Sequence, residues 1–260
     1  MNLTDNETLK FLCGIPILFD DICAIYPATL RQIVEIGYDN FQRYLSILLI
    51  EKEANIDNQK NDEISQLLTE LTDYQYLLMF SALDKEVNRV LKEAFNFFTH
   101  ESITISLEPA QIIIGPIEEK HLLTEEKFYD FRRILKKMYF IDQDEEEIII
   151  NADDSPSVKK LKMQMRANRE KVKRAKAKKA EQEKNDLHFS DLIGSVTINN
   201  CGLNINNIWD ITYYAFHDQL KRMGWRDQFN INNQAALAGA KLKKSQLKHW
   251  MRSIASSDKS

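Results

Sequence analysis

The chain has 260 residues, of which 43% are hydrophobic and 28% charged, and its formal net charge is −4. This hydrophobic fraction is enough for a core and excludes a wholly disordered chain. The longest apolar runs, such as residues 45–50, are far shorter than the roughly 20 residues that cross a bilayer, so a membrane protein is also excluded. Three scattered cysteines and no secretory signal segment predict a reducing compartment.

The charge is unevenly distributed along the chain. Residues 1–150 carry a net charge of −14, residues 151–188 carry +6 and residues 189–260 carry +4. The chain is therefore acidic first and basic afterwards, which suggests separate parts.

The first 150 residues are predicted to form a mostly helical domain. Pro27 lies where a short helix would begin, Gly37 lies where it could end, and a second helix follows from about Tyr38. The paired acids Asp20-Asp21 are interpreted as a turn or helix cap and not as a catalytic pair, because adjacent helical residues point about 100° apart.

Further along, apolar residues recur at three- and four-residue intervals from residue 67 to residue 91. This spacing predicts amphipathic helices that are broken near Thr72-Asp73 and near Asp84. Strict alternation over residues 103–107, followed by an apolar run at residues 112–114, predicts a small β-hairpin.

Two more elements are expected before the N-terminal domain ends. Thr124 is a candidate cap for an amphipathic helix that ends near Tyr139. Residues 148–150 could add one more strand to the hairpin.

The clearest domain boundary is the turn-rich stretch 151–157, after which a polar segment without helix breakers runs to about residue 184. We predict a linker over residues 151–186 that contains one long exposed basic helix. We interpret it as joining two domains, with an acidic protein contact or nucleic acid as the alternatives. Its marker cations are Lys159, Lys160, Arg166, Arg169, Lys173 and Arg174.

Residues 187–260 are predicted to form a small helical, aromatic-rich domain. Asn206 or Asn207 could cap a helix that ends at Gly224. Its aromatic side chains would form the core, but three tryptophans exceed what so small a core readily hides, and an exposed excess would mark a partner site. The candidate partner-binding residues are Trp209, Tyr213, Phe216, Trp225, His249 and Trp250.

The sequence shows no pattern that is typical of catalysis. No nucleophile has an evident neighbouring base, the histidines and cysteines lack the short paired spacings of a zinc site, and the seven glycines form no phosphate-binding loop. We therefore predict a protein that is not an enzyme, with no catalytic residues, no cofactor and no metal. The predicted fold is mainly α with a small β-hairpin element, as two helical domains joined by a long exposed helix.

Short strings at both ends of the chain carry a family resemblance, and the middle carries none. These strings are Leu12-Cys13-Gly14-Ile15-Pro16-Ile17, Ile25-Tyr26-Pro27, Ile36-Gly37-Tyr38 and Tyr44-Leu45 at the start, with residues 213–225, Leu237-Ala238-Gly239-Ala240 and His249-Trp250-Met251-Arg252 at the end. In these strings the chain resembles tail assembly chaperones of long-tailed phages of Gram-positive bacteria, which are encoded next to the tape measure protein.

The resemblance implies a protein that binds the tape measure protein, helps the tail tube protein polymerise around it, and is not retained in the virion. It also implies a homo-oligomer in the cytoplasm of the infected bacterial host. One alternative is a structural tail or baseplate component of the virion. A second is a nucleic-acid-binding regulator that acts through the basic helix.

Overall fold

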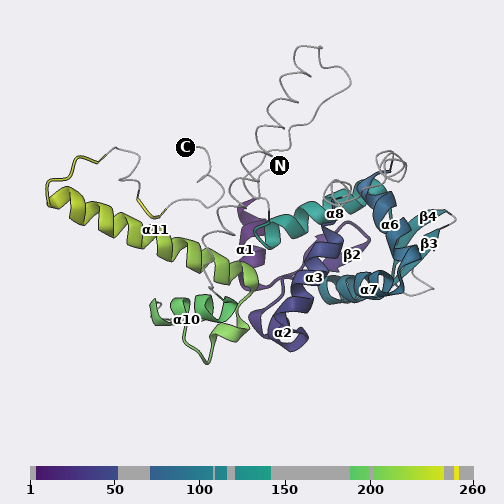
Figure 1. Ribbon diagram of the computed structural model, residues 1–260, viewed down its shortest axis with the longest axis horizontal. Helices are drawn as coiled ribbons and strands as arrows, with labels where there is room; N and C mark the ends of the chain where they lie inside the picture. Colours follow the sequence, from purple (N-terminus) through teal and green to yellow (C-terminus); the bar gives the residue numbers. More distant parts are fainter. Residues whose placement is uncertain are drawn as a thin grey trace, which may run out of the picture. The chain divides into compact units, whose positions relative to one another are not determined.

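A computed structural model of the chain describes residues 4–51, 71–107, 109–115, 121–141, 188–199, 202–242 and 249–251 (Figure 1). It is mostly helical with two small antiparallel sheets, which confirms the predicted fold class. The chain divides into one unit of Met1–Gln143 with Val196–Ser260 and a second unit of Asp144–Ser195. None of the helices in these ranges is both long and apolar enough to cross a bilayer.

The first described elements are a helix and a short hairpin. Helix α1 (Asp5–Cys13) begins at a Thr4 capping box with Glu7 and ends at Gly14, whose left-handed φ of 77° favours glycine. Strands β1 (Ile17–Phe19) and β2 (Cys23–Ile25) then pair antiparallel. The predicted turn at Asp20-Asp21 is confirmed, since it joins these strands. The sequence did not predict the hairpin, because three-residue strands leave almost no alternation to detect.

The next two helices follow one another closely. Helix α2 (Leu30–Ile36) ends at Gly37 and α3 (Tyr38–Leu48) follows at once, which confirms the predicted end and the predicted second helix. The predicted start at Pro27 is wrong, because the Thr29 hydroxyl accepts the Gln32 N–H and the helix begins after that cap.

Two helices and a small sheet come next. Helix α6 (Asp73–Leu83) begins after Thr72, and α7 (Lys85–Thr99) begins after Asp84, which confirms the helix starts predicted at these positions. The helical pattern predicted from residue 67 to residue 70 lies outside the described residues. The predicted hairpin is also confirmed, as β3 (Ile103–Leu107) paired with β4 (Ala110–Ile114).

A third strand and another helix complete this part. Strand β5 (His121–Leu123) pairs with β4, while the strand predicted at residues 148–150 lies outside the described residues. Helix α8 (Glu125–Met138) begins after Thr124, as predicted, and its side chains Phe128, Phe131, Leu135 and Met138 are buried.

The C-terminal part differs most from its prediction. It contains α10 (Phe189–Asn199), a 3-10 turn η1 (Ile208–Asp210) and the 25-residue helix α11 (Tyr213–Leu237). The predicted cap at Asn206 or Asn207 is wrong, because the Thr212 hydroxyl accepts the N–H of Ala215 and starts the helix there. The predicted end at Gly224 is also wrong, since the helix runs through that residue.

Residues 208–218, which we call the docked segment, pack against the N-terminal elements. Thr29 and Thr212 form an antiparallel bridge, flanked by hydrogen bonds from the Leu30 N–H to the Ile211 carbonyl (3.0 Å) and from the Tyr213 N–H to the Ala28 carbonyl (2.8 Å). These bonds hold the start of α11 against the start of α2.

Aromatic side chains fill the space beneath this bridge. The Phe41 ring centroid lies 5.3 Å from that of Tyr213 and 5.4 Å from that of Tyr139, and the Tyr214 ring lies 5.2 Å from Phe11. Such pairs add to the stabilisation from apolar burial. The docked segment therefore shares one core with α1, α3 and Tyr139.

The predicted domain boundaries at residues 150 and 186 lie outside the described residues, so they stay predictions, and the two-domain arrangement is not confirmed. The predicted basic helix also lies outside the described residues, with Lys159, Lys160, Arg166, Arg169, Lys173 and Arg174.

Candidate functional site: a pocket between α1, β1 and α8

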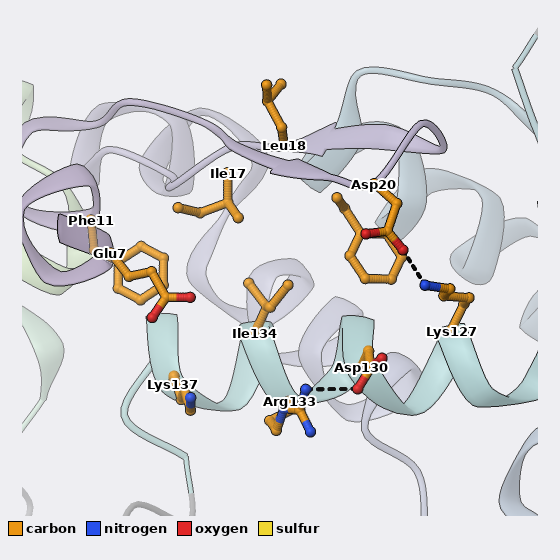
Figure 2. Close-up of a pocket in the computed structure, with 11 residues that line it drawn as sticks. Glu7, Phe11, Ile17, Leu18, Asp20, Lys127, Asp130, Arg133, Ile134 and Lys137 are labelled. Carbon is orange, nitrogen blue, oxygen red and sulfur yellow. Dashed lines mark hydrogen bonds and ion pairs between the residues drawn. The ribbon is translucent and has the colours of Figure 1, made fainter. Parts of the chain in front are cut away.

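A pocket of about 220 Å³ opens between α1, β1 and α8 (Figure 2). Its floor is apolar, because Phe11, Ile17 and Phe19 are buried side chains that face α8. Figure 2 shows Ile17 pointing from β1 toward Ile134 on α8, while Leu18, the next residue of the strand, points to the other side. This alternation is the ordinary geometry of a strand, and it turns Ile17 and Phe19 toward α8, where they form the apolar lining of the pocket.

Charged side chains surround this floor in matched numbers. The Lys127 ammonium pairs with the Asp20 carboxylate at one end, and Arg133 pairs with Asp130 at 2.7 Å along α8. At the other end are Lys137 and Glu7. Burial lowers the pKa of Lys137, the Glu7 carboxylate opposes that shift, and Arg133 adds to it. Three acids and three bases line the pocket, so its rim carries no net charge.

The size and lining of the pocket limit what it can bind. Pockets for small-molecule ligands and cofactors usually enclose roughly 300–1,000 Å³, so this one is small for a nucleotide and better matched to one or two side chains. Its lining residues include no serine, cysteine, threonine, tyrosine or histidine that could act as a nucleophile beside a base. Within the described ranges, no group of three His, Cys, Asp or Glu side chains is placed to hold a metal ion.

The six predicted partner-binding residues do not come together in one place. Tyr213 and Phe216 belong to the core, where they are 7% and 0% exposed. Trp209 is half-buried, and its indole N–H donates to the Ile205 carbonyl at 2.7 Å.

Of the other three residues, Trp225 lies midway along α11, and His249 and Trp250 lie beyond its end. Trp225 and Trp250 are half-buried, and His249 is exposed with its ring 4.9 Å from that of Phe229. Because none of the six lines the pocket, their role in partner binding stays a prediction.

Sequence reasoning missed the pocket residues because they come from three separated segments. One signal was present in each helix. Glu7 and Phe11 are four residues apart on one face of α1, and Ile134 belongs to the amphipathic helix that the sequence predicts between Thr124 and Tyr139. The intervening β1 strand, which supplies Ile17 and Phe19, carried no usable pattern.

The docked segment contains one titratable group that should make the fold sensitive to acid. The His217 side chain lies among aromatic rings, 4.3 Å from Tyr213 and 5.7 Å from Phe140 between centroids, and its Nε2 atom is buried without a hydrogen-bond partner. Burial, with a smaller contribution from Lys221, lowers its pKa to about 4. The folded state therefore holds this imidazole neutral.

Acidification should then cost stability through His217 in particular. The unfolded chain binds a proton near pH 6.5 and the folded chain only near pH 4, so the stabilisation is complete above pH 6.5 and is lost as the pH falls toward 4. The loss can reach about 3 kcal/mol. Urea unfolding at several pH values should show a smaller decrease for His217→Gln than for the unchanged chain. The exposed His249→Gln should retain the full decrease, and equal curves for the two variants would contradict this assignment.

Comparison with known proteins gives one family match. Residues 178–255 match the model of a family described as the YomV second domain. Searches of curated proteins and of solved structures find no match. The matched family is phage-associated, and the matched range covers all of the docked segment and α11. The match supports a phage-related protein and does not specify tail assembly.

Proposed function

We propose that this protein is a tail assembly chaperone that binds the tape measure protein and helps the tail tube to polymerise. The observation that carries the proposal is the pocket between α1, β1 and α8, an apolar cavity with a charge-balanced rim. The phage-associated family match over residues 178–255 supports the setting. In this proposal the chain works by contact and not by catalysis.

The chemistry of the pocket favours a polypeptide as its ligand. Protein interfaces depend on a few bulky side chains that fill desolvated pockets, and a cavity of about 220 Å³ fits such an anchor. A phosphate-bearing ligand would need an excess of cations, whereas here acids equal bases. An apolar side chain from an amphipathic helix needs no such excess, and a tape measure protein is expected to be largely helical.

Co-expression with the tape measure and tail tube proteins tests the proposal. The tagged full chain should retain the tape measure protein on an affinity column, and Ile134→Gln should weaken that retention about tenfold by placing a polar side chain in the apolar lining of the pocket. The matched control is Ile36→Gln, which alters an equally half-buried isoleucine at the end of α2. Circular dichroism should show that both variants keep the helical content.

Two outcomes would count against the proposal. One is a chain that fails to retain the tape measure protein in co-expressing and infected cells alike. The other is detection of stoichiometric amounts of the chain in purified particles, which would favour a structural component of the tail.

A further inference from the structure

The side chain of Phe11 is shared between the pocket and the docked segment. It is the only buried side chain of α1, and it lines the pocket. Figure 2 shows Phe11 and Glu7 together at the end of the pocket where Lys137 lies. The ring centroid of Phe11 also lies 5.2 Å from that of Tyr214, and the Phe11 carbonyl accepts the Thr212 hydroxyl at 2.8 Å. One residue therefore contacts both the pocket and the docked segment.

The Tyr214 ring connects two sides of the pocket at this end. Besides Phe11 on α1, it contacts Phe140, which lies two residues after the end of α8 and stacks on Tyr214 with 4.6 Å between centroids. Thr8, which also belongs to α1, forms a side-chain hydrogen bond with Tyr214. Tyr214 thus lies against α1 and against the chain that leaves α8, and these are two of the three elements that form the pocket.

Helix α1 depends on the docked segment for its position. It has nine residues, and isolated helices shorter than roughly 12–15 residues are marginal in water. Among the described elements, α11 makes the most extensive contact with α1. A Cβ atom added to Gly14, at the end of α1, would lie 3.3 Å from Thr212 Cγ2, so the two segments are closely packed there. The pocket wall that Glu7 and Phe11 form is therefore held in place by the docked segment.

We propose that docking of residues 208–218 and binding in the pocket are coupled, with Tyr214 as the positioning residue and α1 as the element that both events fix. The inference rests on the proposed function for the identity of the ligand. A ligand that touches Phe11 needs α1 where the docked segment holds it, so it binds the docked state more tightly. Because coupling between two sites is reciprocal, a filled pocket also tightens docking. A segment that contributes no lining residue thereby controls the pocket.

Amide hydrogen exchange of the full chain tests the coupling without any ligand. Tyr214→Ala should make the amides of α1 exchange about tenfold faster or more, while those of α6 change little, because α1 loses its anchor. Tyr214→Phe keeps the ring between Phe11 and Phe140 and should restore most of the protection. The matched control is Tyr76→Ala, which removes a similarly buried ring that stacks on Phe80 in α6. It should speed exchange in α6 and leave α1 at its original rate.

Retention of the tape measure protein tests whether the coupling reaches the pocket. Tyr214→Ala should weaken that retention about tenfold, which is within the usual range for coupled sites, although Tyr214 does not line the pocket. Tyr214→Phe and Tyr76→Ala should retain the tape measure protein as well as the unchanged chain does. Bound tape measure protein should in turn slow amide exchange in the docked segment of the unchanged chain.

The outcomes distinguish the coupling from the proposed function. If Tyr214→Ala leaves exchange in α1 unchanged, the coupling is wrong whatever the pocket binds. If α1 exchanges faster but retention of the tape measure protein is unaffected, the wall formed by Phe11 is not part of the binding site, and the coupling is again overturned. If the unchanged chain retains no tape measure protein while Tyr214→Ala still speeds exchange in α1, the proposed function fails and the coupling of the docked segment to the pocket wall stands.

Discussion

Replacement of Arg132 by alanine should lower the free energy of unfolding by about 3–5 kcal/mol. Only 4% of this residue is exposed, and its guanidinium joins three elements. One Nη donates to Asp73 at the start of α6 at 2.9 Å, and the other donates to the carbonyls of Leu49 and Ile50, also at 2.9 Å. Removing it leaves a partly buried carboxylate and two carbonyls without their donor. Urea unfolding at neutral pH would measure the loss.

The neighbouring arginine provides the control. Arg133 is 52% exposed and pairs with Asp130 one turn away, so Arg133→Ala should cost less than about 1 kcal/mol. Similar losses for the two variants would mean that the buried network does not anchor α8. Arg132→Met should recover part of the loss, because it keeps the apolar packing of the side chain against Phe128.

Replacement of Tyr213 by alanine should destabilise the core that contains α2 and α3 as well as α11, by about 3 kcal/mol. The Tyr213 ring packs on Phe41 of α3 and on Tyr139. The backbone N–H of Tyr213 donates a hydrogen bond to the Ala28 carbonyl. A cavity at this position therefore opens inside the shared core. Amide hydrogen exchange should become faster in α2 and α3 as well as in α11, in proportion to the lost stability.

Phe229→Ala is the matched control, because it removes a half-buried aromatic ring from the same helix beyond the docked segment. It should leave exchange in α2 and α3 unchanged. If Tyr213→Ala speeds exchange in α11 alone, the docked segment is not part of the core that includes α3.

Helices α3, α6, α7 and α8 could be predicted because their signals are local, whereas α1 was not predicted and α2 begins three residues after Pro27. The caps Thr72, Asp84 and Thr124 each bind a backbone N–H within three residues, so each of these helix starts is encoded in a few adjacent positions. The alternation over residues 103–107 predicted β3 for the same reason. The start of α11 was misplaced because Asn206, Asn207 and Thr212 are all good helix caps. Local chemistry therefore does not distinguish them, and packing decides which one starts the helix.

The docked segment and the pocket could not be predicted, because both depend on contacts between residues distant in sequence. The pairing of Thr29 with Thr212 leaves no trace in either local pattern. The aromatic residues of the docked segment fit an independent small core equally well, so composition alone could not show that Tyr213 packs on Phe41. The pocket needs β1 beside α8, and a strand of three residues gives too short a pattern to place it.

The bridge between Thr29 and Thr212 also sets an order of events during synthesis. Phe11, Phe41 and Tyr139 emerge from the ribosome well before the rings that cover them, since residues 142–218 must still be translated. At about 5–20 residues per second, that takes roughly 4–15 s. During this time the aromatic side chains of the nascent chain that later contact the docked segment lack that cover. We expect them to bind ribosome-associated folding factors, and we expect the chain to aggregate if translation stalls before residue 208.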